Sequence, residues 1–307
     1  MNLREWALPI YTILIQLATG VMLALWVIKA IFQKQLSDSD LKSMNLIPLG
    51  IIVLTILMGV IGAHFHLSRP LFSLFSILNI KTSWLSREIA FTILLFLFSV
   101  ITLGFHILKT DHTRLSNVSG WLTVFWGFCT VYCMANIYIL PTQTLWSSSY
   151  SLFSYFATTL LLGVTSLSAI LLMVLNYSKL NDDVRCGKYE KVIRTSLPWM
   201  AGFSMLFGLI VFSLNIQSIT SLQQIDHMSA RISLQLILDL YWPLVILRFV
   251  FLILGIIHFC SVVFIRLKQG NVLNEMINPS YISFIFIVAG EVLGRFLFYA
   301  THVRVGI

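Results

Sequence analysis

Charged residues are scarce in this chain. They make up 10% of its 307 residues, whereas 58% are hydrophobic. The mean hydropathy of +0.90 is too high for a soluble domain, even one with a large core. Between Arg114 and Lys179 there is no charged residue at all. The composition therefore predicts a protein that crosses a membrane several times.

Cysteine is also scarce, with four residues in the whole chain. Cys129 and Cys133 fall within one apolar stretch, and Cys186 and Cys260 lie far apart in the sequence. An iron–sulfur cluster usually needs four cysteine ligands. The sequence also lacks a glycine-rich phosphate loop and any polar segment long enough for a separate catalytic domain. We therefore expect no metal site in this chain, and we assign any cluster to a partner.

Eight apolar stretches are long enough to cross a bilayer, which takes about 20 helical residues. Backbone groups in lipid must bond within the segment, so each stretch is expected to be a helix. The expected spans are about 8–32, 46–66, 88–108, 120–140, 151–175, 197–216, 243–265 and 281–301. The long stretch without charge is divided at Pro141-Thr142-Gln143. The sequence thus predicts an all-α integral membrane protein, a bundle of eight transmembrane helices forming one polytopic domain over residues 1–307.

The positive charges are unevenly distributed between the two ends of these spans. Loops after odd-numbered spans hold twelve lysines and arginines, whereas the termini and the other loops hold six. Because positive loops stay in the cytoplasm, both termini are predicted outside, in the periplasm of a bacterium, with the chain multi-pass in the inner membrane. The net charge of +8 reflects this asymmetry and attraction to lipid headgroups, so no nucleic-acid partner is expected.

Ionisable groups meet at the outer end of the second and third spans. His64 and His66 close the second span, and Glu88 opens the third. An imidazole and a carboxylate at one depth could accept the two protons released when a quinol is oxidised. The two histidines lie about 200° apart around a helix, and we favour His66. The structural alternative for Glu88 is a first-turn acid beside the helix dipole, with Ser86 as the cap.

Charged residues also lie within the last two spans. Because a charge in hydrocarbon is costly, such residues are usually paired or functional. Four residues of the eighth span fall within about 60° on one helical face: Glu291, Arg295, Phe298 and His302. The structural alternative is an intrahelical Glu291–Arg295 pair that neutralises itself. Arg248 of the seventh span could join this group or pair with Asp239.

The motifs together resemble a known family. They are Trp6 with Leu8-Pro9, His66-Leu67 with Pro70, Leu85-Ser86 with Glu88-Ile89, Arg248, Gly290-Glu291, Gly294-Arg295, Phe298-Tyr299 and His302. In this order and spacing they resemble the membrane-anchor subunit of dimethyl sulfoxide reductase, the DmsC type. The resemblance runs over nearly the whole chain and includes the eight spans.

The resemblance implies a haem-free subunit that anchors a ferredoxin-like iron–sulfur subunit and a molybdopterin catalytic subunit, and that oxidises menaquinol from the bilayer in anaerobic respiration. By position, His66 and Glu88 would belong to the quinol site. We interpret Arg248, Glu291, Arg295 and His302 as further residues that bind the quinol, between spans two, three and eight. Where the family commonly has a glycine after its His-Leu pair, this chain has Ser68, which puts the quinone preference and the docking contact in question.

Two other classes stay open. A cytochrome b-like subunit would need histidines on facing helices, and His106 and His258 both fall toward the inner side. A secondary transporter would use midplane charges such as Glu291 and Arg295 beside broken helices, although the sequence has no inverted repeat.

Overall fold

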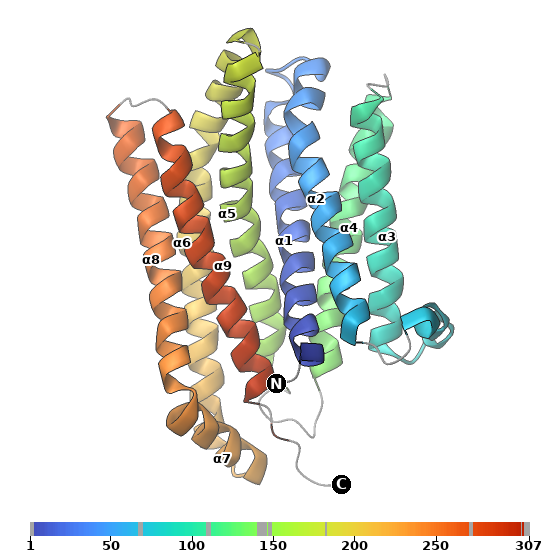
Figure 1. Cartoon of the computed structure of the whole chain (residues 1–307), viewed down its shortest axis with the longest axis vertical. Helices are drawn as coiled ribbons and strands as arrows, with labels where there is room; N and C mark the ends of the chain where they lie inside the picture. Colours follow the sequence, from blue (N-terminus) through green and yellow to red (C-terminus); the bar gives the residue numbers. More distant parts are fainter. Residues whose placement is uncertain are drawn as a thin grey trace.

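The structure is a computed structural model that describes residues 3–66, 70–108, 112–139, 146, 149–181, 183–269, 273–301 and 303. This part of the chain is helical and contains no strand (Figure 1). Eight helices are long and apolar enough to cross a membrane: α1 (Leu3–Phe32), α2 (Asp38–His66), α3 (Trp84–Ile107), α4 (Thr113–Tyr138), α5 (Ser149–Asn181), α6 (Asp183–Gln224), α8 (Trp242–Lys268) and α9 (Ile277–Ala300). The shorter elements are η1 (Pro70–Asn79), α7 (Met228–Gln235), η2 (Leu236–Leu240) and η3 (Leu273–Met276). The predicted all-helical membrane bundle is confirmed.

Helix α1 begins and α9 ends at the same end of the bundle (Figure 1). We name this end the terminus face and the other end the opposite face. Helices α3, α5 and α8 also begin at the terminus face, and α2 ends there. An even number of membrane-spanning helices places the beginning of the first helix and the end of the last helix on the same side. Which face lies outside the cell stays a prediction from the charge distribution.

The charge-free stretch forms two helices, because α4 ends at Tyr138 and α5 begins at Ser149. Helix α6 is much longer than the expected span 197–216. Its 42 residues correspond to about 63 Å at 1.5 Å per residue, about twice the hydrocarbon thickness. Lys188, Lys191 and Arg194 lie in its first turns. Since lysine and arginine are good helix formers, the helix continues into the aqueous boundary.

Helices α1 and α5 pack together at the centre of the bundle, between α2, α3 and α4 on one side and α6, α8 and α9 on the other. Gly20 and Gly163 face each other across this contact, and a Cβ on either would overlap the other's backbone. Such close approach supplies the van der Waals packing that holds helices together in lipid. The side chains of α1 and α5 can therefore contact helices on both sides of the bundle.

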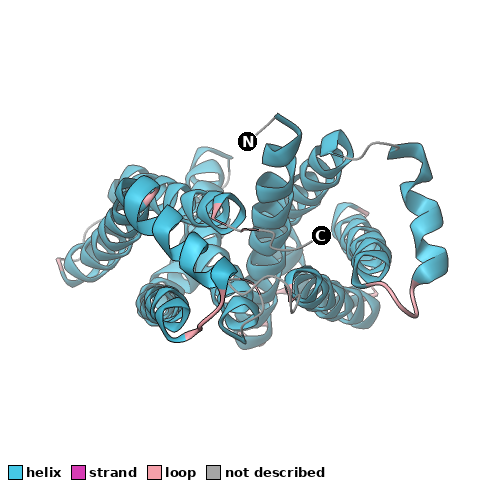
Figure 2. Cartoon of the chain, turned by 90° about the horizontal axis from the view of Figure 1, so that it is seen from below, coloured by secondary structure: helices cyan, strands magenta, loops and turns pink. Residues whose placement is uncertain are grey.

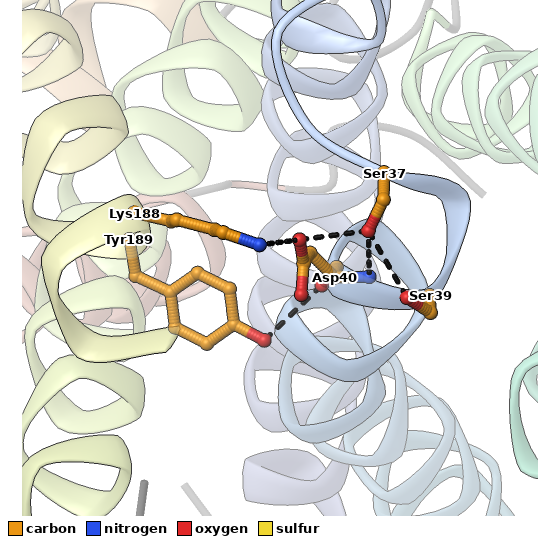
Figure 3. A network of polar contacts seen from close by, with 5 residues as sticks. All are labelled: Ser37, Ser39, Asp40, Lys188 and Tyr189. Carbon is orange, nitrogen blue, oxygen red and sulfur yellow. Dashed lines mark hydrogen bonds and ion pairs between the residues drawn. The ribbon is translucent and has the colours of Figure 1, made fainter. Parts of the chain in front are cut away.

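A polar network at the opposite face joins α2 to α6 (Figure 3). Ser37 donates a hydrogen bond of 2.7 Å to Asp40, and the backbone N–H of Asp40 donates to the Ser37 hydroxyl. Lys188 of α6 forms an ion pair of 2.6 Å with Asp40, and the Tyr189 hydroxyl donates to the Asp40 carbonyl. The network caps the start of α2 and attaches it to α6.

Two short elements lie at separate edges of the terminus face, as the view onto this face shows (Figure 2). The 3₁₀-helix η1 lies beside α3, and α7 lies beneath α6 and α8. Arg87 fixes the end of η1, because its guanidinium donates to the carbonyls of Ile80 and Lys81 and lies over the Trp84 ring. Leu78 of η1 is 83% exposed. Its position suits a segment that lies at the membrane surface.

Candidate functional site

Glu88 lies just beyond the first turn of α3, so the alternative of a first-turn acid is wrong, and it is buried, with 6% of its surface exposed. The Tyr11 hydroxyl of α1 lies near the Glu88 side chain. The same hydroxyl lies 2.9 Å from the Thr92 hydroxyl, which donates to the Glu88 carbonyl. The cap of α3 is Ser83 and not Ser86, since the Ser83 side chain accepts from the helix backbone. The carboxyl of Glu88 is therefore directed into the bundle.

For His66, the expected partner of Glu88, the structure describes the backbone but not the side chain. His66 is the last residue of α2, and α2 ends on the same face on which α3 begins. The side chain of His66 and all of His302 lie outside the described part of the chain. His64 is exposed, and its Nδ1 lies 2.7 Å from the Val60 carbonyl oxygen of its own helix. Pairing of His66 with Glu88 stays a prediction.

Glu291 of α9 is held by neighbouring helices. Its Oε2 accepts a hydrogen bond of 2.9 Å from Thr158 of α5, and it lies 3.9 Å from the Arg248 guanidinium of α8. Arg248 in turn donates a bond of 2.5 Å to the Asn215 side chain of α6. The interpretation that Arg248 pairs with Asp239 is therefore wrong, and Asp239 is exposed.

Arg295 is directed away from Glu291, toward α1 and α5. It donates a hydrogen bond of 2.9 Å to the Gln16 side chain, and its guanidinium lies 3.6 Å from the centre of the Tyr155 ring. The Gln16 amide donates 2.7 Å to the Tyr155 carbonyl. Both charges of α9 thus contact α5, but Glu291 otherwise pairs with α8 and Arg295 with α1, which replaces the intrahelical pair given as the structural alternative.

The glycines of Gly290-Glu291-Val292-Leu293-Gly294-Arg295 make room for α8. A Cβ at Gly290 would press on Leu252, and one at Gly294 would overlap the Arg248 guanidinium. The two glycines are four residues apart, so they lie on one face of α9. They allow Arg248 to pass close to the α9 backbone and reach Glu291.

Charged residues of α8 and α9 from the interior of the bundle line a cavity of about 90 Å³. Its wall includes Arg248, Glu291 and Arg295, with Tyr155 and Phe298 among the aromatic rings. Glu88 is not part of this wall. The sequence therefore identified two groups of ionisable residues that lie apart in the structure.

Helix α1 stands between the two groups. Its Tyr11 contacts the Glu88 group, and its Gln16 contacts Arg295. Residues five apart lie about 140° apart around a helix, so these side chains leave α1 on different faces. Helix α9 packs on α8, α5 and α1, whereas α3 packs on α4, α2 and η1. One pocket shared by the second, third and eighth spans does not match this packing.

Sequence reasoning missed an aromatic cluster between these groups. It comprises Tyr138 of α4, Trp146, Tyr155 of α5, and Phe298 and Tyr299 of α9. The Tyr299 hydroxyl donates to the Tyr138 hydroxyl at 2.8 Å, and Trp146 donates to the Phe298 carbonyl. Tyrosines within apolar spans were the available signal, since a buried hydroxyl needs a partner.

The two histidines considered for a haem lie on opposite sides of the bundle. His106 belongs to α3, where its ring packs edge-on against Trp26 of α1. His258 belongs to α8, where its Nδ1 lies 2.8 Å from the Ser283 hydroxyl of α9. Helices α3 and α8 are separated by the rest of the bundle (Figure 1). These two residues cannot ligate one haem together.

Comparison with known proteins gives two matches over the whole length. The family model described as DMSO reductase anchor subunit (DmsC) matches residues 1–301. The chain is also 27% identical over 306 residues to the anaerobic dimethyl sulfoxide reductase chain YnfH of Escherichia coli (strain K12), covering 99% of this chain and 96% of the relative.

Proposed function

Because the chain belongs to the DMSO reductase anchor subunit family, we propose that it is the quinol-oxidising membrane subunit of a molybdopterin oxidoreductase. In this proposal it takes electrons from menaquinol in the bilayer and passes them to an iron–sulfur subunit. That subunit delivers them to the molybdopterin catalytic subunit in anaerobic respiration. The likeness to a dimethyl sulfoxide reductase chain over 99% of the sequence supports the assignment.

The observation that carries the proposal is the placement of Glu88. It is an acid buried just beyond the first turn of α3, near the hydroxyls of Tyr11 and Thr92. Burial of a carboxyl within a membrane span costs free energy, so such residues are usually paired or functional. Helix α2 ends in His66 on the same face, which supports a second proton acceptor there.

The proposed chemistry balances with these two residues. A quinol that becomes a quinone loses two protons and two electrons. His66 and Glu88 accept the protons as general bases and release them to water at the terminus face. The electrons leave through the iron–sulfur subunit, which we place on the same face. That face would be periplasmic in the bacterial inner membrane, in agreement with the smaller number of lysines and arginines on it.

Glu88→Gln tests the proposal in the purified three-subunit complex. Quinol-dependent reduction of the terminal acceptor should fall by about 100-fold or more, because loss of a general base typically costs this much. Reduction by a soluble artificial donor that bypasses the membrane subunit should not change. The two rates, measured on one preparation, separate the quinol step from failed assembly.

Glu190→Gln is the matched control, because Glu190 is a partly exposed carboxylate at the opposite face, paired with Arg194 of the same helix. It should leave both rates unchanged. Glu88→Asp, which keeps the carboxyl, should recover part of the quinol-dependent rate. Full quinol turnover in Glu88→Gln would remove Glu88 from the mechanism.

A further inference from the structure

We propose that the cavity between α5, α6, α8 and α9 binds a small oxyanion of the phosphate type, held by Arg248 and Arg295. This cavity is separate from the Glu88 group and lies on the other side of α1. The inference does not depend on quinol oxidation.

The first reason is charge. Of the described residues that line the cavity, the charged ones are Arg248, Arg295 and Glu291. Two guanidiniums and one carboxylate leave a formal surplus of one positive charge. Their exposed fractions are 7%, 5% and 2%, so water outside the protein screens this surplus poorly. An unbalanced charge in a low-dielectric interior is costly, and an anion of opposite charge would offset that cost.

The second reason is hydrogen bonding. The Nε atoms of Arg248 and Arg295 have no hydrogen-bond partner among the described residues, and neither does Oε1 of Glu291. Buried polar atoms are almost always partnered. Tyr150, Ser154 and Ser218, whose side chains carry hydroxyls, also line the cavity. The two partnerless guanidinium Nε atoms outnumber the one partnerless carboxylate oxygen, which suits an oxyanion as the ligand.

The third reason is size. At about 90 Å³ the cavity is far below the volume of about 300–1,000 Å³ that drug-sized ligands occupy. It is several times larger than the volume of about 10–15 Å³ that one water needs. A tetrahedral oxyanion with a few waters fits this range, whereas a bicyclic quinone ring does not.

The cavity reaches toward the terminus face, where an anion can enter. Tyr150 and Ser151 at the start of α5 line it, and so does Thr301 directly after α9. The start of α5 and the end of α9 both lie at the terminus face (Figure 1). Phosphate from solution and the phosphate of an anionic lipid both present the required chemistry there.

Thermal stability of the delipidated complex in neutral detergent tests the proposal. Inorganic phosphate is titrated at constant ionic strength, with gluconate as the balancing anion because it is too large for the cavity. The readout is the fraction of the membrane subunit that stays soluble after heating. Because a ligand that binds the native state raises its stability, the wild-type chain should show a saturating increase.

Two substitutions should shift the apparent phosphate affinity in opposite directions. Arg248→Gln lowers the formal surplus to zero and should weaken binding by about tenfold or more, given the strength of one charge at this range. Glu291→Gln raises the surplus to two and should tighten binding by a similar factor. A purely structural role would not produce opposite signs. Arg231→Gln, at an exposed arginine of α7, is the control and should keep the wild-type response.

The source of the anion is resolved by a second titration with phosphatidylglycerol. A response to inorganic phosphate supports a free anion as the ligand. A response to phosphatidylglycerol alone, lost in Arg248→Gln, supports a lipid headgroup. No stabilisation by either ligand in the wild-type chain, or equal responses in both charge variants, would overturn the proposal.

Discussion

Two polar networks tie distant helices together in this protein, one at each face. The network at the opposite face joins Asp40 to Lys188, whose side chain is 47% exposed. The network near the terminus face joins Glu291 to Arg248, whose side chains are 2% and 9% exposed. Both link different helices, yet only the second has charged atoms without partners among the described residues.

The difference shows that the burial of a charged group affects its role. An exposed ion pair only joins two helices, whereas a buried group with free donors can also bind a ligand. A lysine near the aqueous boundary is solvated by water when its partner is removed, so no further partner is required to stabilise its charge. Buried guanidiniums cannot do so, and their free donors remain available for a ligand. Of the two networks, the one near the terminus face is therefore the candidate for binding.

Glu291→Gln should have the largest effect on stability. It leaves two buried guanidiniums without a counter-charge, and breaking a buried pair costs about 3–5 kcal/mol. Arg248→Gln should cost less, because it removes the surplus. Denaturant titration of the membrane subunit in mild detergent measures both. If Arg248→Gln is the more destabilising variant, the surplus of positive charge does not determine the stability of this charge group.

Gly294→Ala should have an intermediate effect. The added methyl group overlaps the Arg248 guanidinium, and overpacking typically costs about 1–3 kcal/mol. Gly104→Ala is the control, because nothing lies within 4 Å of a Cβ there. It should be neutral or slightly stabilising, since alanine favours a helix. The same titration compares the two, and equal stabilities would mean that Arg248 moves aside freely.

Lys188→Ala should have the smallest effect. Lys188 is half exposed and Asp40 keeps its hydrogen bond from Ser37, so loss of the pair should cost at most about 1 kcal/mol. Salt should weaken the wild-type pair further, so the difference from wild type should shrink as ionic strength rises. A loss as large as that of Glu291→Gln would remove the contrast between the two faces.

Sequence reasoning located the long apolar helices, but the spans that it gave are not the helix ends. Apolar length predicts where a chain crosses hydrocarbon, and it found eight crossings. It placed the sixth span at 197–216, whereas α6 runs from Asp183 to Gln224. Helix formation does not stop at the hydrocarbon edge when the flanking residues, such as Lys188 and Arg194, also favour a helix.

The same reasoning identified Arg248, Glu291 and Arg295 and offered Arg248 as a neighbour of Glu291, but it did not find their uncharged partners. Helical spacing places Glu291 beside Arg295, although the direction of each side chain depends on what the neighbouring helices offer. Gln16 of α1 and Thr158 of α5 supply those partners. Both are uncharged residues in apolar spans, so no local pattern singled them out.

The sequence by itself determined that this protein is a membrane bundle of eight long apolar helices, because hydrocarbon admits so few backbone solutions. It also determined which residues carry the costly buried charges. The tertiary structure alone decided how those charges are grouped, because α1 separates Glu88 from the cavity lined by Arg248, Glu291 and Arg295. That grouping depends on contacts between helices up to 279 residues apart in the chain, which no local pattern encodes.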